Sequence, residues 1–351
     1  MKIPESFSKK KIIRETFFAV LAGIFGIAVI SIFTHNWNFL SMIRSFKPEL
    51  LILSFIMMIC NWLLEAYTLQ IISNSLNYNM KFSESLYLFL IGGFFSRITP
   101  FGGGGGEPVQ MVVLAQSKKI KPGDSAAIIA IKMFIGTFVR LSVFIFIPLW
   151  LLIAKPSWGM TTKQNILINA GIALTVLLFS LLIAALLRPQ IAEGIASWVL
   201  KLKVLKKILR EKQIIAAVNN LKKTVNDFRE ARAKIFKANQ KMITYAFAAS
   251  FVIWGLILFT PVVLMRGLGI TSPWPEIVIT AIIFYISSAY IPTPGGSGTS
   301  EIEILALFSR LIPSPLIGVF IITWRVFTHY LLLIFGGFVT LLQFKRKPKP
   351  Q

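Results

Sequence analysis

Long apolar stretches recur along the chain and are separated by shorter polar segments. A run of about 20 apolar residues is long enough to cross the hydrocarbon core of a membrane as a helix. The pattern therefore predicts an all-α polytopic membrane protein with about six full transmembrane helices. Their expected bounds are 15–33, 49–72, 124–153, 164–187, 242–265 and 316–343.

Two other apolar stretches are interrupted by glycine and proline. The first break runs from Pro100 to Glu107, and the second runs from Pro294 to Glu301. In both, the glutamate follows the proline by seven residues. Each glycine costs a helix about 1 kcal/mol relative to alanine, and proline removes a backbone donor, so helices end at these breaks. Because the flanking limbs are too short to span, we expect re-entrant helical hairpins at 85–117 and 276–311.

The spacing beyond the breaks also matches. Pro122 is followed by Lys132 after ten residues, and Pro315 is followed by Arg325 at the same spacing. Interrupted apolar segments at corresponding places in two halves are typical of transporters built from two repeats. Ordinary loops between helices are the alternative interpretation. The repeats are expected at 10–153 and 164–343, within a single integral membrane domain covering 1–351.

The charge distribution predicts how the chain is oriented. Its net charge of +23 comes mostly from basic residues at helix ends and in the segment 188–241. This pattern follows the positive-inside rule and favours anionic lipid headgroups over nucleic acid as partners. With the expected spans, it places both termini and a basic connector, 188–241, in the cytoplasm and makes the repeats inverted in topology. Part of 188–241 is expected along the inner leaflet, with solvated connector helices as the alternative.

Few residues suit metal or nucleophilic chemistry. Cys60 is the only cysteine, and His35 and His329 are the only histidines. Disulfides, thiolate metal sites and zinc centres are therefore not expected. The glycine run lacks the lysine and hydroxyl ending of a P-loop, and no serine–histidine–acid set or acid cluster stands out. We expect no cofactor, no metal and no catalytic residue.

The broken helices and the nearby cations predict a binding site for an anion. Free backbone amides of glycine turns and helix starts form a concavity for a group such as a lipid phosphate. Lys132 and Arg140 lie eight residues apart on one helix face, with Gly136 between them. Ionisable residues inside spans usually mark a pathway or a pair. The residues expected to bind substrate are Gly104, Gly105, Gly106, Glu107, Lys132, Arg140, Gly295, Gly296, Ser297, Gly298, Glu301 and Arg325.

Other polar residues are expected to form pairs or gates. Asn61, Glu65 and Thr68 share one face of the span 49–72, because residues three and four apart are neighbours on a helix. Glu65 could then neutralise either cation of the span 124–153 as a structural partner. The residues expected to pair or gate are Glu65, Arg97, Glu303 and His329.

The acids at the breaks also have a structural interpretation. Acidic residues at a helix start offset the helix dipole, so helix capping is the alternative role. In the first hairpin the second limb is expected to start at Pro108 with Glu107 at the cap. In the second hairpin, Ser300 and Glu303 fit a capping box, and Glu301 falls in the first turn.

The second break carries a resemblance to a known family. The run from Pro292 to Gly298, followed by Glu301 and by Trp324-Arg325, resembles the transmembrane region of bacterial lysylphosphatidylglycerol synthase/flippases and their stand-alone relatives. The resemblance covers about residues 10–343. It implies a flippase-like domain of the bacterial cytoplasmic membrane and a link to antimicrobial peptide resistance. The family's soluble aminoacyltransferase domain follows the membrane part, so a chain ending at Gln351 is expected to be a stand-alone member without it.

Two functional interpretations follow. We expect a lipid translocase that moves an anionic or aminoacylated phospholipid, or a related lipid with a phosphate headgroup. The alternative is a membrane enzyme or a lipid-presenting subunit, of the phosphatidylglycerol lysyltransferase or glycolipid transferase type, with a glutamate as general base. A scaffold for other lipid enzymes is a third interpretation. Membrane phospholipid is the expected partner, and the sequence is compatible with either a monomer or a homo-oligomer.

Overall fold

The computed structural model describes residues 44, 46–99, 105–117, 120–154, 233, 240–288 and 293–345. All regular secondary structure in these ranges is helical. Four helices are long and apolar enough to cross a membrane, at Pro48–Asn74, Pro122–Ile147, Gln240–Gly267 and Ser314–Leu342. They correspond to the predicted spans 49–72, 124–153, 242–265 and 316–343. The predicted spans 15–33 and 164–187 and most of the connector 188–241 lie outside the described residues.

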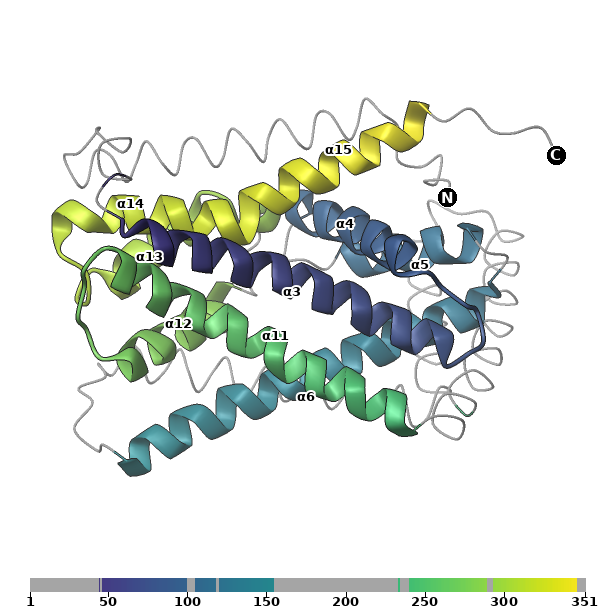
Figure 1. The fold of residues 1–351 in the computed structure, drawn as a ribbon, viewed down its shortest axis with the longest axis horizontal. Helices are drawn as coiled ribbons and strands as arrows, with labels where there is room; N and C mark the ends of the chain where they lie inside the picture. Colours follow the sequence, from purple (N-terminus) through teal and green to yellow (C-terminus); the bar gives the residue numbers. More distant parts are fainter. Residues whose placement is uncertain are drawn as a thin grey trace, which may run out of the picture.

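Three long helices run along the long axis of the molecule (Figure 1): α3 (Pro48–Asn74), α6 (Pro122–Ala154) and α11 (Gln240–Gly267). Helix α3 starts with Pro48 in its first turn, where a missing backbone N–H costs nothing. It packs along α11, and Asn61 Nδ2 donates to the carbonyl of Ile253 at 3.5 Å. This pairing sets a polar side chain of α3 against the backbone of α11.

The fourth long helix contains a change of helix type. Helix α14 (Ser314–Arg325) continues through a π-helical turn, η2 (Val326–Tyr330), into α15 (Leu331–Lys345). The sequence pattern predicts only a continuous helix here. Single π turns are rare and are often found at functional sites. This turn places His329 and Tyr330 on the stretch that faces the second break.

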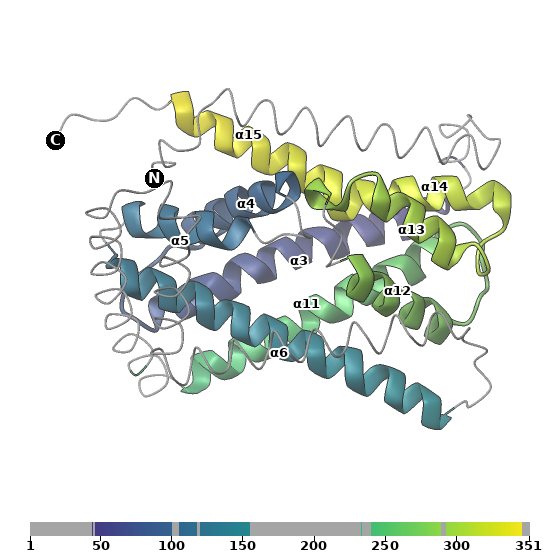
Figure 2. The ribbon, with the colours of Figure 1, turned by 180° about the vertical axis from the view of Figure 1, so that it is seen from behind.

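Both predicted helix–break–helix units are present. The first consists of α4 (Phe82–Ile98) and α5 (Gly106–Ser117). The second consists of α12 (Trp274–Ser288), the short 3₁₀ turn η1 (Pro294–Gly296) and α13 (Thr299–Phe308). Figures 1 and 2 both place α4 and α5 in one half of the molecule along its long axis, and α12 and α13 in the other half. The two units therefore approach the middle from opposite ends.

Glycines allow close packing around the first unit. A Cβ added to Gly106 would overlap the carbonyl of Gly92, so α5 approaches α4 more closely than any other residue would allow. A Cβ added to Gly336 of α15 would overlap the carbonyl of Leu90 in the same way. Helix α4 is thus packed on two sides through backbone contacts, which fixes the position of its carboxyl end.

Buried apolar side chains form two large clusters. The cluster around α12, α13 and α14 is centred on Trp324, whose ring lies 5.1–5.4 Å from those of Phe284, Phe308 and Phe320. The other cluster joins α4, α5 and the first half of α6. Each cluster contains apolar side chains from at least one of the broken units.

Candidate functional site

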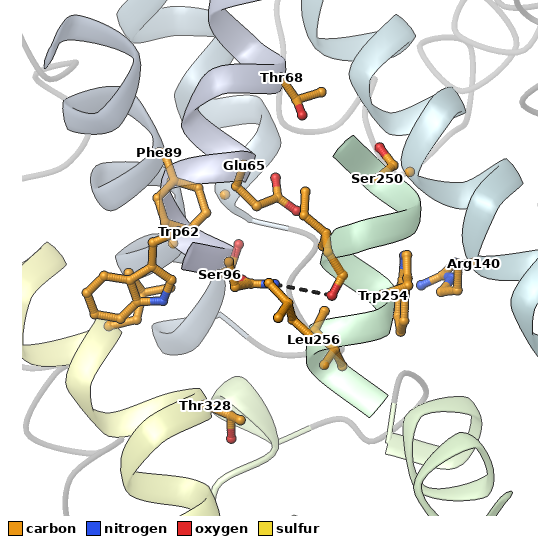
Figure 3. Close-up of a pocket in the computed structure, with 18 of the residues that line it drawn as sticks. Trp62, Glu65, Thr68, Phe89, Ser96, Arg140, Ser250, Trp254, Leu256 and Thr328 are labelled. Carbon is orange, nitrogen blue, oxygen red and sulfur yellow. Dashed lines mark hydrogen bonds between the residues drawn. The ribbon is translucent and has the colours of Figure 1, made fainter. Parts of the chain in front are cut away.

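A cavity of about 580 Å³ lies between the long helices. Its walls come mainly from α3, α4, α5, α6 and α11, and α12, η2 and α15 contribute single residues or pairs. Figure 3 shows Glu65 on α3, Trp254 on α11 and Arg140 on α6 around this hollow. We refer to it as the charged cavity, because five acidic or basic side chains line it: Glu65, Arg97, Glu107, Lys132 and Arg140.

Two helix faces predicted from spacing form opposite walls. Asn61, Glu65 and Thr68 all line the cavity from α3. Lys132, Gly136 and Arg140 line it from α6, as expected for residues four apart on one face. A Cβ added to Gly136 would have no atom within 4 Å, so this position leaves open space between the two cations.

Lys132 and Glu65 form an ion pair across the cavity. Lys132 Nζ lies 2.9 Å from Glu65 Oε2 and 6.0 Å from the centre of the Phe89 ring. The side chains keep 16% and 27% of their exposure, respectively, so both remain accessible from the hollow. Lys132 is thus a partly exposed cation that already has a carboxylate partner.

Arg97 forms part of the wall near the end of α4. Its Nη1 donates to the carbonyl of Gly93 at 3.2 Å, and its Nη2 donates to the carbonyl of Thr328 at 3.1 Å. Its Nε is buried and has no hydrogen-bond partner among the described residues. The guanidinium thus bridges α4 and the π turn, and its Nε–H is left without a partner among the described residues.

The start of α5 completes the wall. Gly106 and Glu107 both line the cavity from the first turn of α5. This helix begins two residues before Pro108, the predicted start, so Glu107 lies inside the helix rather than at its cap. Gly105 packs against Thr99, since an added Cβ would overlap the threonine side chain. Gly104 lies outside the described residues.

The two breaks contact each other. The backbone N–H of Gly295 donates to the carbonyl of Thr99 at 3.0 Å. Gly295 has φ of 56°, and a Cβ there would overlap the carbonyl oxygen of Arg97 and the ring of His329. Glycine is required at this position for both reasons. The contact joins the end of α4 to the loop before α13.

A second polar group, which we call the Glu301 cluster, is sealed from solvent. Glu301 Oε1 accepts hydrogen bonds from Arg325 Nε and Tyr330 OH, both at 2.8 Å, and Oε2 accepts from the Gly298 N–H at 2.8 Å. The side chains of Glu301 and Arg325 are 1% and 8% exposed. Three donors, one of them cationic, thus compensate the burial of this carboxylate.

The capping box predicted at Ser300 and Glu303 is wrong by two residues. Helix α13 is capped by Gly298, which has φ of 84°, and Glu301 occupies the third helical position and folds back onto the cap. The positive φ of Gly298 starts the helix without a side-chain cap. Glu303 instead accepts a short hydrogen bond from Ser287 of α12.

The remaining predicted residues surround the Glu301 cluster. Ser297 Oγ lies 3.2 Å from His329 Nε2, and both side chains are buried. Gly296 has φ of 73° and lies directly before Ser297. The predicted site residues therefore separate into two neighbouring groups. Gly106 and Glu107 of the first break and the two cations of α6 line the charged cavity, whereas Glu301 and Arg325 form the sealed cluster.

Comparison with known proteins agrees with this architecture. The family described as "Lysylphosphatidylglycerol synthase TM region" matches residues 18–336. The chain belongs to this family. A relative, described as a UPF0104 membrane protein from Archaeoglobus fulgidus, is 25% identical over 318 residues, which is 91% of this chain and 94% of the relative. No solved structure matches the chain.

In this member of the lysylphosphatidylglycerol synthase TM family, several wall residues were not predicted. Trp62, Phe89, Gln110, Trp254 and Tyr285 line the charged cavity. Gln110 follows Glu107 by three residues, so its position on the same helix face was a usable signal. The aromatic residues carried no such signal, because an aromatic side chain in an apolar helix suits a lipid-facing, core or cavity position equally.

The contact between the breaks should be intolerant of a side chain. We expect Gly295→Ala to destabilise the protein by at least about 1–2 kcal/mol, because alanine is strained at positive φ and its Cβ would overlap Arg97. Thermal unfolding in detergent, followed by size-exclusion chromatography, measures the effect. Gly255→Ala is the matched control, since Gly255 lies in α11 with no atom within 4 Å of an added Cβ. Equal stability of both variants would contradict the prediction.

Arg325 should be essential for folding stability. Arg325→Ala leaves Glu301 buried without its cation, and removing one partner of a buried ion pair costs about 3–5 kcal/mol. Arg310→Ala serves as the control, because Arg310 is exposed and, among the described residues, donates a hydrogen bond to the Thr280 hydroxyl at 3.3 Å. The same unfolding measurement should place Arg310→Ala close to the parent. An Arg325→Ala protein as stable as that control would show that the pair contributes little.

Proposed function

We propose that this protein binds lipids with a phosphate headgroup and moves them across the membrane. Anionic or aminoacylated phospholipids are the proposed substrates. The proposal rests on one observation: a large cavity lined by five acidic or basic side chains lies between helices long enough to span a membrane. Ionisable groups are expensive in that setting and usually mark a substrate or ion pathway. Membership of the lysylphosphatidylglycerol synthase TM family supports a lipid as that substrate.

The proposed headgroup site uses the charges already described. Lys132 and Arg97 offer a cationic amine and an unused guanidinium donor to the phosphate. Glu65 and Glu107 suit hydroxyl or ammonium groups of the same headgroup. The acyl chains would stay in the lipid, so that only the polar end enters the charged cavity. Arginine and lysine differ here, because arginine can bind phosphate through two parallel hydrogen bonds.

The proposed movement depends on two inverted repeats, each with a re-entrant hairpin. The units α4–α5 and α12–α13 lie in opposite halves of the molecule, and their breaks meet at Gly295 and Thr99. In transporters of this kind, broken helices line the site near the midplane, and one repeat rocks against the other. Unwound backbone at that depth is tolerated where protein or a wet cavity satisfies it. Both features support alternating access to the charged cavity.

Filling the cavity should stop transport without damaging the fold. Gly136→Leu adds a side chain to open space between Lys132 and Arg140, and leucine is a better helix former than glycine. We expect movement of a fluorescent phosphatidylglycerol in proteoliposomes to fall close to the rate of empty vesicles. Gly255→Leu is the control, because Gly255 has equal space but does not line the cavity. Full transport by Gly136→Leu would rule out the cavity as the route.

A paired substitution separates phosphate binding from a structural ion pair. Lys132→Gln leaves Glu65 unpaired, and the double variant Lys132→Gln/Glu65→Gln removes both charges of the pair. If Lys132 binds the phosphate, lipid movement stays low in the single and in the double variant. Recovery of the parent rate in the double variant would mean that the pair serves only the fold.

The enzyme interpretation makes a different prediction in the same vesicles. Proteoliposomes are supplied with an aminoacyl-tRNA or a sugar donor, and their lipids are analysed by mass spectrometry. A modified lipid without any lipid movement would favour the enzyme over the translocase. Movement without added donor supports the translocase. If no cavity variant changed either activity, a scaffold would be favoured.

A further inference from the structure

Arg97 contacts both the charged cavity and the π turn beside the Glu301 cluster. It lines the charged cavity, yet its Nη2 is bonded to the Thr328 carbonyl in the middle of the π turn. Arg325 directly precedes that turn and Tyr330 ends it. These are the two side chains that hold Glu301 Oε1. A single side chain therefore connects the cavity wall to the segment that seals the Glu301 cluster.

We propose that an anionic headgroup in the charged cavity draws Arg97 away from the π turn and thereby opens the Glu301 cluster. This inference rests on the proposed function only in taking the ligand to be an anionic lipid. The present partners of Arg97 are neutral carbonyls of Gly93 and Thr328. Hydrogen bonds to an ionised acceptor are about twice as strong as neutral ones. A phosphate in the cavity can therefore compete successfully for the guanidinium.

The π turn is an element with two available forms. It is a single turn, Val326–Tyr330, between two α-helices, and π geometry is rare compared with α geometry. One residue of a helix corresponds to about 100° of rotation. Conversion of the turn to α-helix would therefore rotate Tyr330 away from its present direction relative to Arg325. Both side chains cannot then hold Glu301 as they do now.

The first broken unit supports the existence of an open form. Glu107 and Lys132 occupy the positions that match Glu301 and Arg325, at the same spacing from Pro100 and Pro122. Lys132 is paired with Glu65 instead, and Glu107 lines the cavity. A unit of this kind thus folds without an ion pair between its hairpin acid and its helix cation. The pair in the second unit can therefore open without loss of the fold, as a coupled two-state element requires.

Cysteine labelling can test the coupling. Cys60→Ser removes the native thiol, and Ser297→Cys introduces a reporter next to His329, at a side chain that is 2% exposed. Maleimide labelling is followed in nanodiscs of phosphatidylcholine or of phosphatidylglycerol. We expect phosphatidylglycerol to raise the labelling rate about tenfold, within the usual range of allosteric coupling. Equal rates in the two lipids would overturn the proposal.

Arg97→Gln tests whether this residue carries the coupling. Because Arg97 is itself a proposed phosphate ligand, the phosphatidylglycerol content of the nanodiscs is raised until the variant binds as much of this lipid as the parent, counted by mass spectrometry of the washed protein. At that matched occupancy we expect equal labelling rates with and without phosphatidylglycerol. Arg266→Gln is the matched control, because Arg266 also donates from Nη1 and Nη2 to two carbonyls, those of Ile270 and Ser272. It lies outside the cavity wall and should keep the lipid dependence. Persistent lipid dependence in Arg97→Gln at matched lipid occupancy overturns the proposal.

Two further variants calibrate the reporter. Tyr330→Phe removes one hydrogen bond to Glu301 and should raise labelling in phosphatidylcholine without unfolding. Glu301→Gln should raise it further, and size-exclusion chromatography checks that the protein is folded. No increase in either folded variant would contradict a cluster that seals Ser297. Labelling does not require lipid movement, so coupling without transport would refute the proposed function alone, and transport without coupling would refute this inference alone.

Discussion

The interrupted backbone at the two breaks must find partners inside the protein, and the rest of the structure depends on how it does so. The Gly295 N–H meets the Thr99 carbonyl at 3.0 Å, and no residue with a side chain fits where Gly295 lies against Arg97. Because an unpaired buried backbone group costs as much as a lost hydrogen bond, this contact holds the breaks together. It places Arg97 on the cavity wall. It also positions Glu301, six residues after Gly295, where three donors reach the carboxylate.

The two broken units have matching acids and cations, but the burial of these charges is compensated differently in each unit. Glu301 is buried from solvent, and its carboxylate accepts hydrogen bonds from a cationic guanidinium, a hydroxyl and a backbone amide. Lys132 and Glu65 keep contact with a hollow, where a ligand or water can share in solvating them. Further hydrogen bonds help to stabilise a buried pair. The Gly298 N–H and the Tyr330 hydroxyl supply them to Glu301, whereas Arg325 Nη2 has no partner among the described residues. Similar residues therefore support a closed cluster in one unit and an accessible site in the other.

Helical periodicity was sufficient to predict both polar walls of the cavity. Asn61, Glu65 and Thr68, and Lys132 with Arg140, were grouped correctly because spacing alone decides which side chains share a helix face. The breaks were predictable for a similar reason, since glycine and proline act on the local backbone. The four described spans also lie close to their predicted bounds.

Features that depend on contacts between distant segments were not predictable in this way. The π turn Val326–Tyr330 has no sequence signature of its own; Arg97 of another helix binds its carbonyl. Their matching spacing predicted the same role for Arg325 and Lys132. The acid that pairs with each cation, however, comes from a different helix, which spacing along the cation's own helix cannot identify. The cap of α13 was misplaced because Gly298 starts the helix through positive φ, which composition alone cannot reveal.

The same contacts indicate where movement costs least. Among the described residues, one backbone hydrogen bond joins the two breaks, whereas α4 is clamped by glycine contacts with α5 and α15, and Trp324 is packed among four aromatic rings. Local opening is cheapest where buried contacts are few. Relative motion should therefore concentrate at the Thr99–Gly295 contact and leave each broken unit intact. Arg97 lies beside that contact, bonds to the π turn and forms part of the cavity wall. A change in its hydrogen-bond partners therefore occurs where local opening costs the least free energy.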